Sequence, residues 1–135
     1  MEKIVKKKVS LTGIKPTGTP HIGNYLGAIK PALERVEKYE ARYFIADYHA
    51  LNSIRDPETL QNNIYEVAAT WLACGLDPEQ VILYKQSAVP ETFELTTMLM
   101  AFTAKGLMNR AHSYKARVAE NEVMGKDPDY AINMG

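Results

Sequence analysis

The sequence predicts an α/β fold, namely the N-terminal half of a doubly wound parallel sheet. Three short apolar runs alternate with segments whose apolar residues recur at helical spacing, and a glycine-rich loop follows the first run. Connections of helical length between successive strands imply right-handed parallel crossovers. No internal repeat or low-complexity segment interrupts this pattern.

The first two strands flank the first helix. Val9–Ile14 is a short apolar run that glycine and proline stop, as expected of a buried strand. Apolar residues from Ile22 to Val36 follow at helical spacing, and Pro31 predicts a kink or a break within them. RYFIADYHAL, residues 42–51, is predicted as the second strand, and its continuous apolar stretch Tyr43–Ala46 indicates burial on both faces.

The second helix has the clearest boundaries. Asp56-Pro57-Glu58 combines a capping carboxylate, a proline at the first helical position and an acid in the first turn, and Gly75 ends the helix. The predicted elements after it are a single turn at Asp77-Pro78-Glu79, a third strand at residues 81–85, a helix from Pro90 to about Thr103, and a short helix with a mobile loop beyond Gly106.

Composition excludes several classes of protein. At 135 residues and 46% hydrophobic, the chain can bury the core of one domain. Its 16 basic and 16 acidic residues cancel, and the local run Lys6–Lys8 is typical of a solvated edge. The single cysteine, Cys74, excludes an internal disulfide, and no signal peptide or membrane span is apparent, so we expect a cytoplasmic protein. The ending AINMG lacks a cap, which predicts a piece of a longer chain.

The loop after the first strand is the strongest functional signal. SLTGIKPTGTPHIGNYLGAI, residues 10–29, contains four glycines directly before a helix. In a doubly wound sheet this loop lies at the carboxyl edge, where ligands bind. A tight turn with glycines at positive φ would need one or two of them, so four favour a phosphate held by backbone N–H groups and a helix N-terminus.

Two common nucleotide motifs do not fit. The dinucleotide fingerprint G-x-G-x-x-G is absent, and Asp47 is the only acid that could serve at the end of the second strand. GTPHIGNY, residues 18–25, has the glycine spacing of a P-loop, but Asn24 and Tyr25 replace the lysine and the hydroxyl residue. A P-loop kinase is therefore not favoured.

His21-Ile22-Gly23-Asn24 resembles the HIGH-type signature of class I aminoacyl-tRNA synthetases. In order, TGIKPTGTPHIGNYLGAI, FIADYHAL, DPETLQNNI, WLACGLDPEQVILYKQSAVPE and MNRAHSYK resemble the N-terminal half of the bacterial tryptophanyl-tRNA synthetases. The related tyrosine enzymes more often have histidine in place of Asn24. The resemblance implies a Rossmann-like sheet in which residues 1–135 form the N-terminal part of the catalytic, nucleotide-binding domain. The C-terminal half and the anticodon-binding domain would lie outside these residues.

The resemblance also implies the reaction. The carboxylate of tryptophan would attack the α-phosphate of ATP, supplied with Mg²⁺, and the adenylate would pass its acyl group to tRNA(Trp). No enzyme nucleophile is needed, so catalysis is the positioning of two anions and the stabilisation of charge. The family is dimeric through helices near residues 75–110, and no membrane is involved.

Site residues are implied in the same way, with no resident metal. His21 and Asn24 would be catalytic. The ATP-binding residues would be Lys15, Pro16, Thr17, Gly18, Gly23, Asn24, Lys115 and Arg117. The tryptophan-binding residues would be Leu11, Gly13, Ala46 and His49.

Several of these residues have an ordinary structural alternative. His21 could be a satisfied turn residue, His49 a structural histidine, and Arg110, Lys115 and Arg117 a solvated charged face. Lys15 stands where many relatives carry glutamine and adds a full charge, although a lysine facing solvent fits equally well.

Two other functions stay open at this point: a tyrosine-specific relative, and a nucleotide-binding module of the same fold without synthetase activity. The acid that reads the indole N–H and the KMSKS-type loop would both lie beyond residue 135. Their presence in a longer reading frame would separate an enzyme from a module.

Overall fold

A computed structural model describes residues 7–128 and divides the chain into two compact units, one up to Val89 and one from Pro90 on. Each unit is described by itself, and the expectation of a single domain stays a prediction. The predictions made for Lys6 and for the ending AINMG lie outside the described residues.

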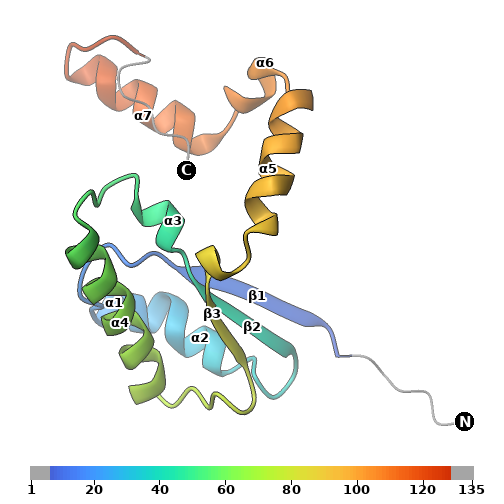
Figure 1. Ribbon diagram of the computed structural model, residues 1–135. Helices are drawn as coiled ribbons and strands as arrows, with labels where there is room; N and C mark the ends of the chain where they lie inside the picture. The colour runs from blue at the N-terminus through green and yellow to red at the C-terminus, as the bar shows by residue number, and fades with distance from the viewer. Residues whose placement is uncertain (1–6, 129–135) are drawn as a thin grey trace, which may run out of the picture. The chain divides into compact units, whose positions relative to one another are not determined.

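The first unit is built on a parallel sheet of three strands in the order β1-β2-β3 (Figure 1). The strands are β1 (Val9–Ile14), β2 (Glu40–Ile45) and β3 (Ile82–Lys85). The predicted α/β fold with parallel strands is confirmed, and β3 begins one residue later than predicted.

The predicted second strand is too long. β2 ends at Ile45, and the helical turn α3 (Asp47–Ala50) follows it. Asp47 is buried, and its Oδ1 accepts hydrogen bonds from the backbone N–H of Tyr48 at 3.1 Å and of Ser87 at 3.0 Å. Ser87 belongs to the 3₁₀ turn η2 (Gln86–Ala88) after β3. His49 therefore lies in a helical turn and not at the end of the strand. The hydrogen bond from Ser87 to Asp47 connects the segment after β2 to the segment after β3.

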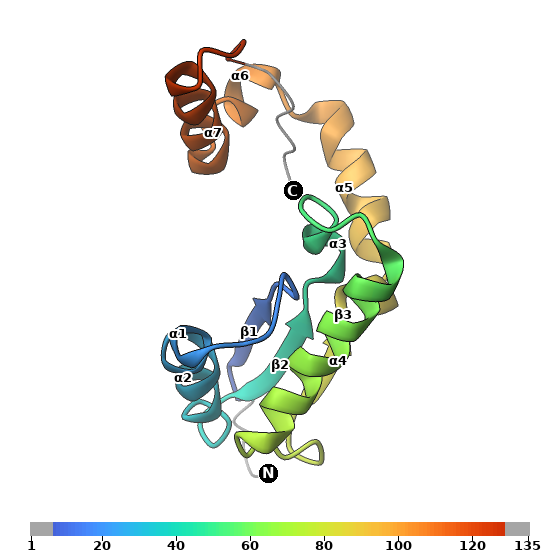
Figure 2. The same ribbon diagram turned by 90° about the vertical axis from the view of Figure 1, so that its left-hand side faces the viewer.

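Helices cover one face of the sheet. The short helices that follow β1 and the long helix α4 (Pro57–Ala73) lie on the same side of it (Figures 1 and 2). Tyr43 and Trp71 pack at the centre of this core with ring centroids 5.1 Å apart, and both side chains are fully buried. Tyr43 Oη donates to the carbonyl of Ala32 at 2.6 Å, and burial raises the pKa of the Tyr43 phenol. The remaining buried members of the core are Ile14, Ile29, Ala41, Ile45, Ile64, Val67, Leu76 and Val81.

The opposite face of the sheet has no covering helix within the first unit. Val9, Leu11 and Ile82 are 52%, 62% and 53% exposed there, and Phe44 is half-buried. The prediction that the second strand is buried on both faces is therefore wrong for the described residues. The reason is topological, because both connections cross on the same side of the sheet.

The helical stretch after β1 is interrupted where proline predicts it. It consists of α1 (Ile22–Asn24), the π-helical segment η1 (Tyr25–Ile29) and α2 (Lys30–Leu33). Pro31 has no N–H, and its ring would clash with the carbonyl four residues earlier. The ladder widens instead, and Lys30 N–H bonds to the carbonyl of Tyr25, five residues back.

Both ends of α4 follow the sequence signals. Asp56 is the N-cap, and its carboxylate accepts from the backbone N–H of Thr59 at 2.8 Å. Gly75 follows the helix with a φ of 99°, a conformation that favours glycine. The hydrogen bonds from the Thr59 hydroxyl and backbone N–H hold the pKa of the Asp56 carboxyl below its usual range.

This cap makes stability depend on pH. Because the folded-state pKa of Asp56 is lowered, its stabilising effect is complete above the unfolded pKa of about 3.9 and is lost as the pH falls through the folded value. In urea unfolding, we expect the stability difference between wild type and Asp56→Ala to shrink on acidification. The stability difference between Asp56→Asn and Asp56→Ala should stay constant over the same pH range, because asparagine caps the helix without a charge. A wild-type difference that stays constant down to about pH 2 would contradict this.

The second unit is helical: α5 (Glu91–Phe102), α6 (Lys105–Met108) and α7 (His112–Val123). The helix predicted from Pro90 to about Thr103 is confirmed. The mobile loop predicted beyond Gly106 is wrong, because residues 112–123 contain neither glycine nor proline and form α7, with an Arg117–Glu120 ion pair one turn apart. Within residues 7–128, no helix is both long and apolar enough to cross a bilayer.

Candidate functional site

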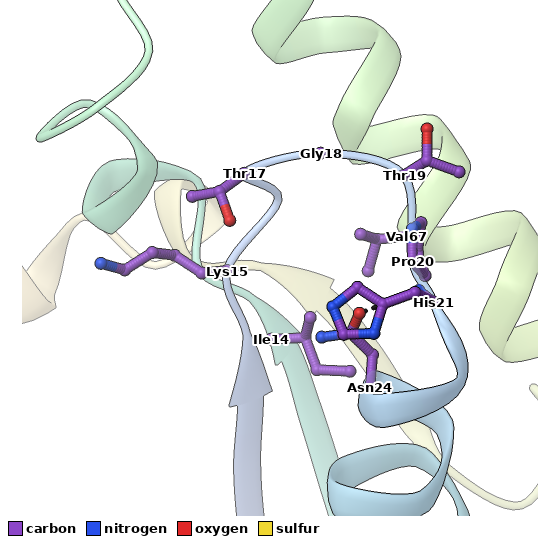
Figure 3. Close-up of a pocket in the computed structure, with 9 residues that line it drawn as sticks. All are labelled: Ile14, Lys15, Thr17, Gly18, Thr19, Pro20, His21, Asn24 and Val67. Atoms are coloured by element: carbon purple, nitrogen blue, oxygen red, sulfur yellow. Dashed lines mark hydrogen bonds between the residues drawn. The ribbon is translucent and has the colours of Figure 1, made fainter.

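The loop between β1 and α1 forms a pocket of about 200 Å³ at the carboxyl end of β1. The loop arches from Lys15 to Pro20 with Gly18 near its top, and His21, Asn24 and Ile14 gather below it (Figure 3). The lining residues are Ile14, Lys15, Thr17, Gly18, Thr19, Pro20, His21, Asn24 and, from α4, Val67. Four of the residues predicted to bind nucleotide, besides His21, therefore line one pocket.

His21 and Asn24 form a reciprocal cap at the start of the helix. The ring atom Nδ1 of His21 accepts from the backbone N–H of Gly23 at 3.1 Å. Asn24 Oδ1 accepts from the backbone N–H of His21 at 2.9 Å. A neutral imidazole that accepts at Nδ1 carries its proton on Nε2. The cap therefore leaves the Nε2–H of His21 and the amide group of Asn24 as donors.

Some glycines of this segment let a neighbouring side chain pack close to the backbone, and others leave the backbone exposed. None of the glycines at positions 13, 18, 23 and 27 has a positive φ, so the turn explanation for them does not hold. A Cβ on Gly23 would lie 2.8 Å from Cε1 of the His21 ring, and one on Gly13 would lie 2.6 Å from the ring of Phe44. A Cβ on Gly18 would meet no atom within 4 Å, so the backbone there is bare beside the pocket.

Pro16 anchors the loop to the body of the unit. Its ring is fully buried, and its carbonyl accepts from the side-chain amide of Asn63 on α4 at 3.3 Å. Pro16 thus shapes the loop from inside, and ligand contact would fall to the exposed Thr17 and Gly18. No sequence signal distinguishes Asn63 from the polar residues Gln61 and Asn62 that precede it on α4.

The pocket is suited to an anion. No acidic residue lines it, and the Lys15 side chain, which extends from the loop on the side away from His21, forms no ion pair with the residues described (Figure 3). Exposed hydroxyls, bare backbone and the Nε2–H of His21 are all hydrogen-bond donors. No cluster of three or more metal-ligating side chains occurs among residues 7–128.

The residues predicted to bind tryptophan do not line this pocket: two lie on β1, and two follow the end of β2. Leu11 and Gly13 share the uncovered face, and Gly13 pairs in register with Phe44 of β2. Ala46 follows β2 and is buried, and its N–H bonds to the carbonyl of Ile14 at 2.8 Å. His49 lies half-buried in α3, with Nδ1 3.0 Å from Oε1 of Gln86. Gln86 is not among the predicted residues, although it directly follows a strand at the same carboxyl edge.

The predicted basic residues lie in the second unit. Arg110 precedes α7, and Lys115 and Arg117 lie on it. Arg117 pairs with Glu120 of the same helix at 2.6 Å. The loop belongs to the first unit, so the assignment of these basic residues to ATP stays a prediction.

Comparison with known proteins gives a consistent result. Residues 6–128 match the family described as tRNA synthetases class I (W and Y). Over 127 residues the chain is 54% identical to a tryptophan–tRNA ligase of Pseudomonas aeruginosa, covering 93% of this chain and 28% of that protein. It is 50% identical over 134 residues to the tryptophan–tRNA ligase of Neisseria meningitidis, covering 97% of this chain and 40% of that protein.

A solved structure supports the same fold. The tryptophanyl-tRNA synthetase of Campylobacter jejuni, solved with ADP and tryptophan, superposes with a TM-score of 0.76 at 44% identity. The match covers 92% of this chain and 37% of that one. The chain thus spans well under half the length of the relatives that it matches.

Proposed function

Because the chain belongs to the class I tRNA synthetases of the tryptophan and tyrosine branch, we propose that it forms the nucleotide-binding part of a tryptophan–tRNA ligase. Residues 1–135 are, in this proposal, the N-terminal part of the catalytic domain. The whole protein activates tryptophan with ATP and transfers it to tRNA(Trp), and it works as a dimer in the cytoplasm.

One observation carries the proposal: the HIGN segment caps its own helix and leaves a ring N–H free at an anion-binding loop. His21 Nδ1 is occupied by Gly23 N–H at 3.1 Å, so the Nε2–H is the group offered to a ligand. The identity of about 50% to named tryptophan–tRNA ligases and the structure with ADP and tryptophan support the choice of ligands.

The chemistry needs two anions to meet. The carboxylate of tryptophan attacks the α-phosphorus of ATP. The bond between the α-phosphorus and the oxygen that bridges it to the β-phosphate breaks, and pyrophosphate leaves. Negative charge grows on the α-phosphate oxygens, where the His21 N–H stabilises it. Lys15 lowers the repulsion between the two anions, and bare backbone at Gly18 and the Thr17 hydroxyl hold the phosphates.

ATP enters as its magnesium complex. The lining of the pocket has no carboxylate, so the phosphates themselves carry the ion as part of the substrate. Tryptophan lies against Gly13 and Leu11 on the uncovered face of the sheet, next to Ala46 and His49.

The test is amino-acid-dependent exchange of pyrophosphate into ATP by the longest product that the gene encodes. Tryptophan should support exchange, and tyrosine at the same concentration should support less than about 1% of that rate, because a site that pairs the indole N–H rejects the wrong ring strongly. Exchange with tyrosine alone would assign the tyrosine branch. Nucleotide binding without exchange would indicate a non-catalytic module.

Gly23→Ala and Asn24→Ala should both weaken the use of ATP with little loss of folding. A Cβ at position 23 displaces the His21 ring, and loss of the Asn24 side chain removes the reciprocal cap. We expect KM for ATP to rise about tenfold, the equivalent of one lost hydrogen bond. Gly27→Ala, in open space in the adjoining π-helical segment η1, is the control. If either variant exchanged pyrophosphate at the wild-type rate at low ATP concentration, that result would contradict the assignment of this segment to ATP binding.

The 135 residues alone should exchange pyrophosphate at least tenfold more slowly than the full-length product. Leu11 and Ile82 are more than half exposed on the sheet face where the amino acid would lie, so that side of the site is open to water. An open site loses the low-dielectric surroundings that strengthen its hydrogen bonds. Exchange within tenfold of the full-length rate would mean that these residues carry far more of the site.

A further inference from the structure

A second histidine at the carboxyl edge of the sheet has its ring fixed by a side chain to which the catalytic proposal assigns no role. His49 Nδ1 lies 3.0 Å from Oε1 of Gln86, in a half-buried setting between α3 and η2. An amide oxygen can only accept, so Nδ1 of His49 carries the proton. In a neutral ring Nε2 is then an acceptor, and it has no hydrogen-bond partner among the described residues.

The two site histidines therefore hold opposite tautomers. His21 accepts at Nδ1 from Gly23 N–H and offers a donor at Nε2. His49 donates at Nδ1 to Gln86 and offers an acceptor at Nε2. A donor suits the phosphate oxygens of a nucleotide, whereas an acceptor suits the ammonium group or the ring N–H of an amino acid.

Gln86 is not needed to hold the junction between the two segments. The carboxylate of Asp47 already ties α3 to η2 by accepting from Ser87 N–H at 3.0 Å, and Asp47 is buried. Ala50 N–H closes the turn of α3 on the carbonyl of Ala46 at 3.2 Å. Removing the Gln86 amide leaves both of these hydrogen bonds in place, so its effect should be confined to the ring of His49.

We propose that Gln86 is a positioning residue that fixes His49 in the Nδ1–H tautomer, so that Nε2 accepts a hydrogen bond from the amino-acid substrate. The inference rests on the proposed function, which assigns His49 to the amino-acid site. It predicts that loss of Gln86 weakens the use of the amino acid and spares the use of ATP, because neither His49 nor Gln86 lines the nucleotide pocket.

The first test reads the tautomer directly. Long-range ¹H–¹⁵N spectra of the histidine-labelled chain, at about pH 8 where an ordinary imidazole is neutral, distinguish the two ring nitrogens. A His49→Asn variant identifies the His49 signals. We expect Nδ1–H in wild type and in Gln86→Glu, which keeps an acceptor oxygen, and a shift toward Nε2–H in Gln86→Met. Nε2–H in wild type, or no change in Gln86→Met, overturns the proposal.

The second test uses pyrophosphate exchange by the full-length product. In Gln86→Met we expect KM for tryptophan to rise about tenfold, the worth of one hydrogen bond, with KM for ATP changed less than about twofold. Gln86→Glu should recover most of the loss. Equal increases in both KM values, or no rescue by glutamate, would show a merely structural role. Absence of tryptophan-dependent exchange in the wild type would instead refute the proposed function.

Discussion

Replacing His21 with alanine lowers the rate of tryptophan-dependent pyrophosphate exchange about 100-fold, mostly in kcat. The reason is the tautomer fixed by the helix cap, in which Nδ1 accepts from Gly23 N–H and Nε2 carries the proton offered to the ligand. A donor whose hydrogen bond strengthens only as charge develops on the α-phosphate acts in the transition state, so its loss appears in turnover rather than in binding.

A matched control separates this effect from a general one. His112→Ala removes an exposed histidine from the start of α7 and should leave kcat within about twofold, as for an ordinary surface substitution. An unchanged kcat with a raised KM for ATP in His21→Ala would assign the ring to ground-state binding and contradict the transition-state role.

Trp71→Ala destabilises the first unit by about 3–5 kcal/mol, the usual range for deleting a buried aromatic side chain. Trp71 is 1% exposed, stacks 5.1 Å from Tyr43 and touches the core where α4 meets the sheet. Trp71→Phe should cost far less, about 1.5 kcal/mol, because Nε1 of Trp71 is buried without a hydrogen-bond partner among the described residues and nothing polar is lost with it.

Urea unfolding of the two variants, followed by far-UV circular dichroism, measures this difference. Circular dichroism is required because Trp71 is the only tryptophan of the chain and its removal abolishes the tryptophan fluorescence. Equal losses in Trp71→Phe and Trp71→Ala would mean that a hidden hydrogen bond to Nε1, rather than packing, gives the residue its importance.

The sequence predicts local structure well where one residue type forces a conformation. Asp56 and Pro57 start α4, and Gly75 ends it at a positive φ. Pro31 interrupts the helical stretch after β1, where the π-helical segment η1 precedes it. In each case the cause lies within a few residues, in a cap, a missing N–H or a steric restriction.

Predictions fail where a distant partner decides. The strand ends at Ile45 because Asp47 reaches Ser87, which is 40 residues away in the chain. The open face of the sheet depends on the side on which both helices cross, which apolar content alone does not encode. α7 forms in a polar segment whose composition suggests a loop, since charge does not oppose a helix whose residues lack glycine and proline.

For the site, the motif predicts the residues of the loop but not their hydrogen bonds. His21, Gly23 and Asn24 follow from the motif, whereas the tautomer follows only from the cap geometry. Gln86 and Asn63 escape prediction because each acts on a residue more than 30 positions away in the chain. The role of the basic residues of α7 in ATP binding remains a prediction.

The central claim is that the loop from Lys15 to Asn24 holds the phosphates of ATP. Amide ¹H–¹⁵N spectra of the chain, recorded while a non-hydrolysable ATP analogue is added, test it most directly. The largest shifts should fall on Thr17, Gly18, His21 and Gly23, with little change at Tyr65 and Leu83, which line the separate groove between α4 and β3. Shifts concentrated in that groove, or a loop that does not respond at saturating analogue, would contradict the account.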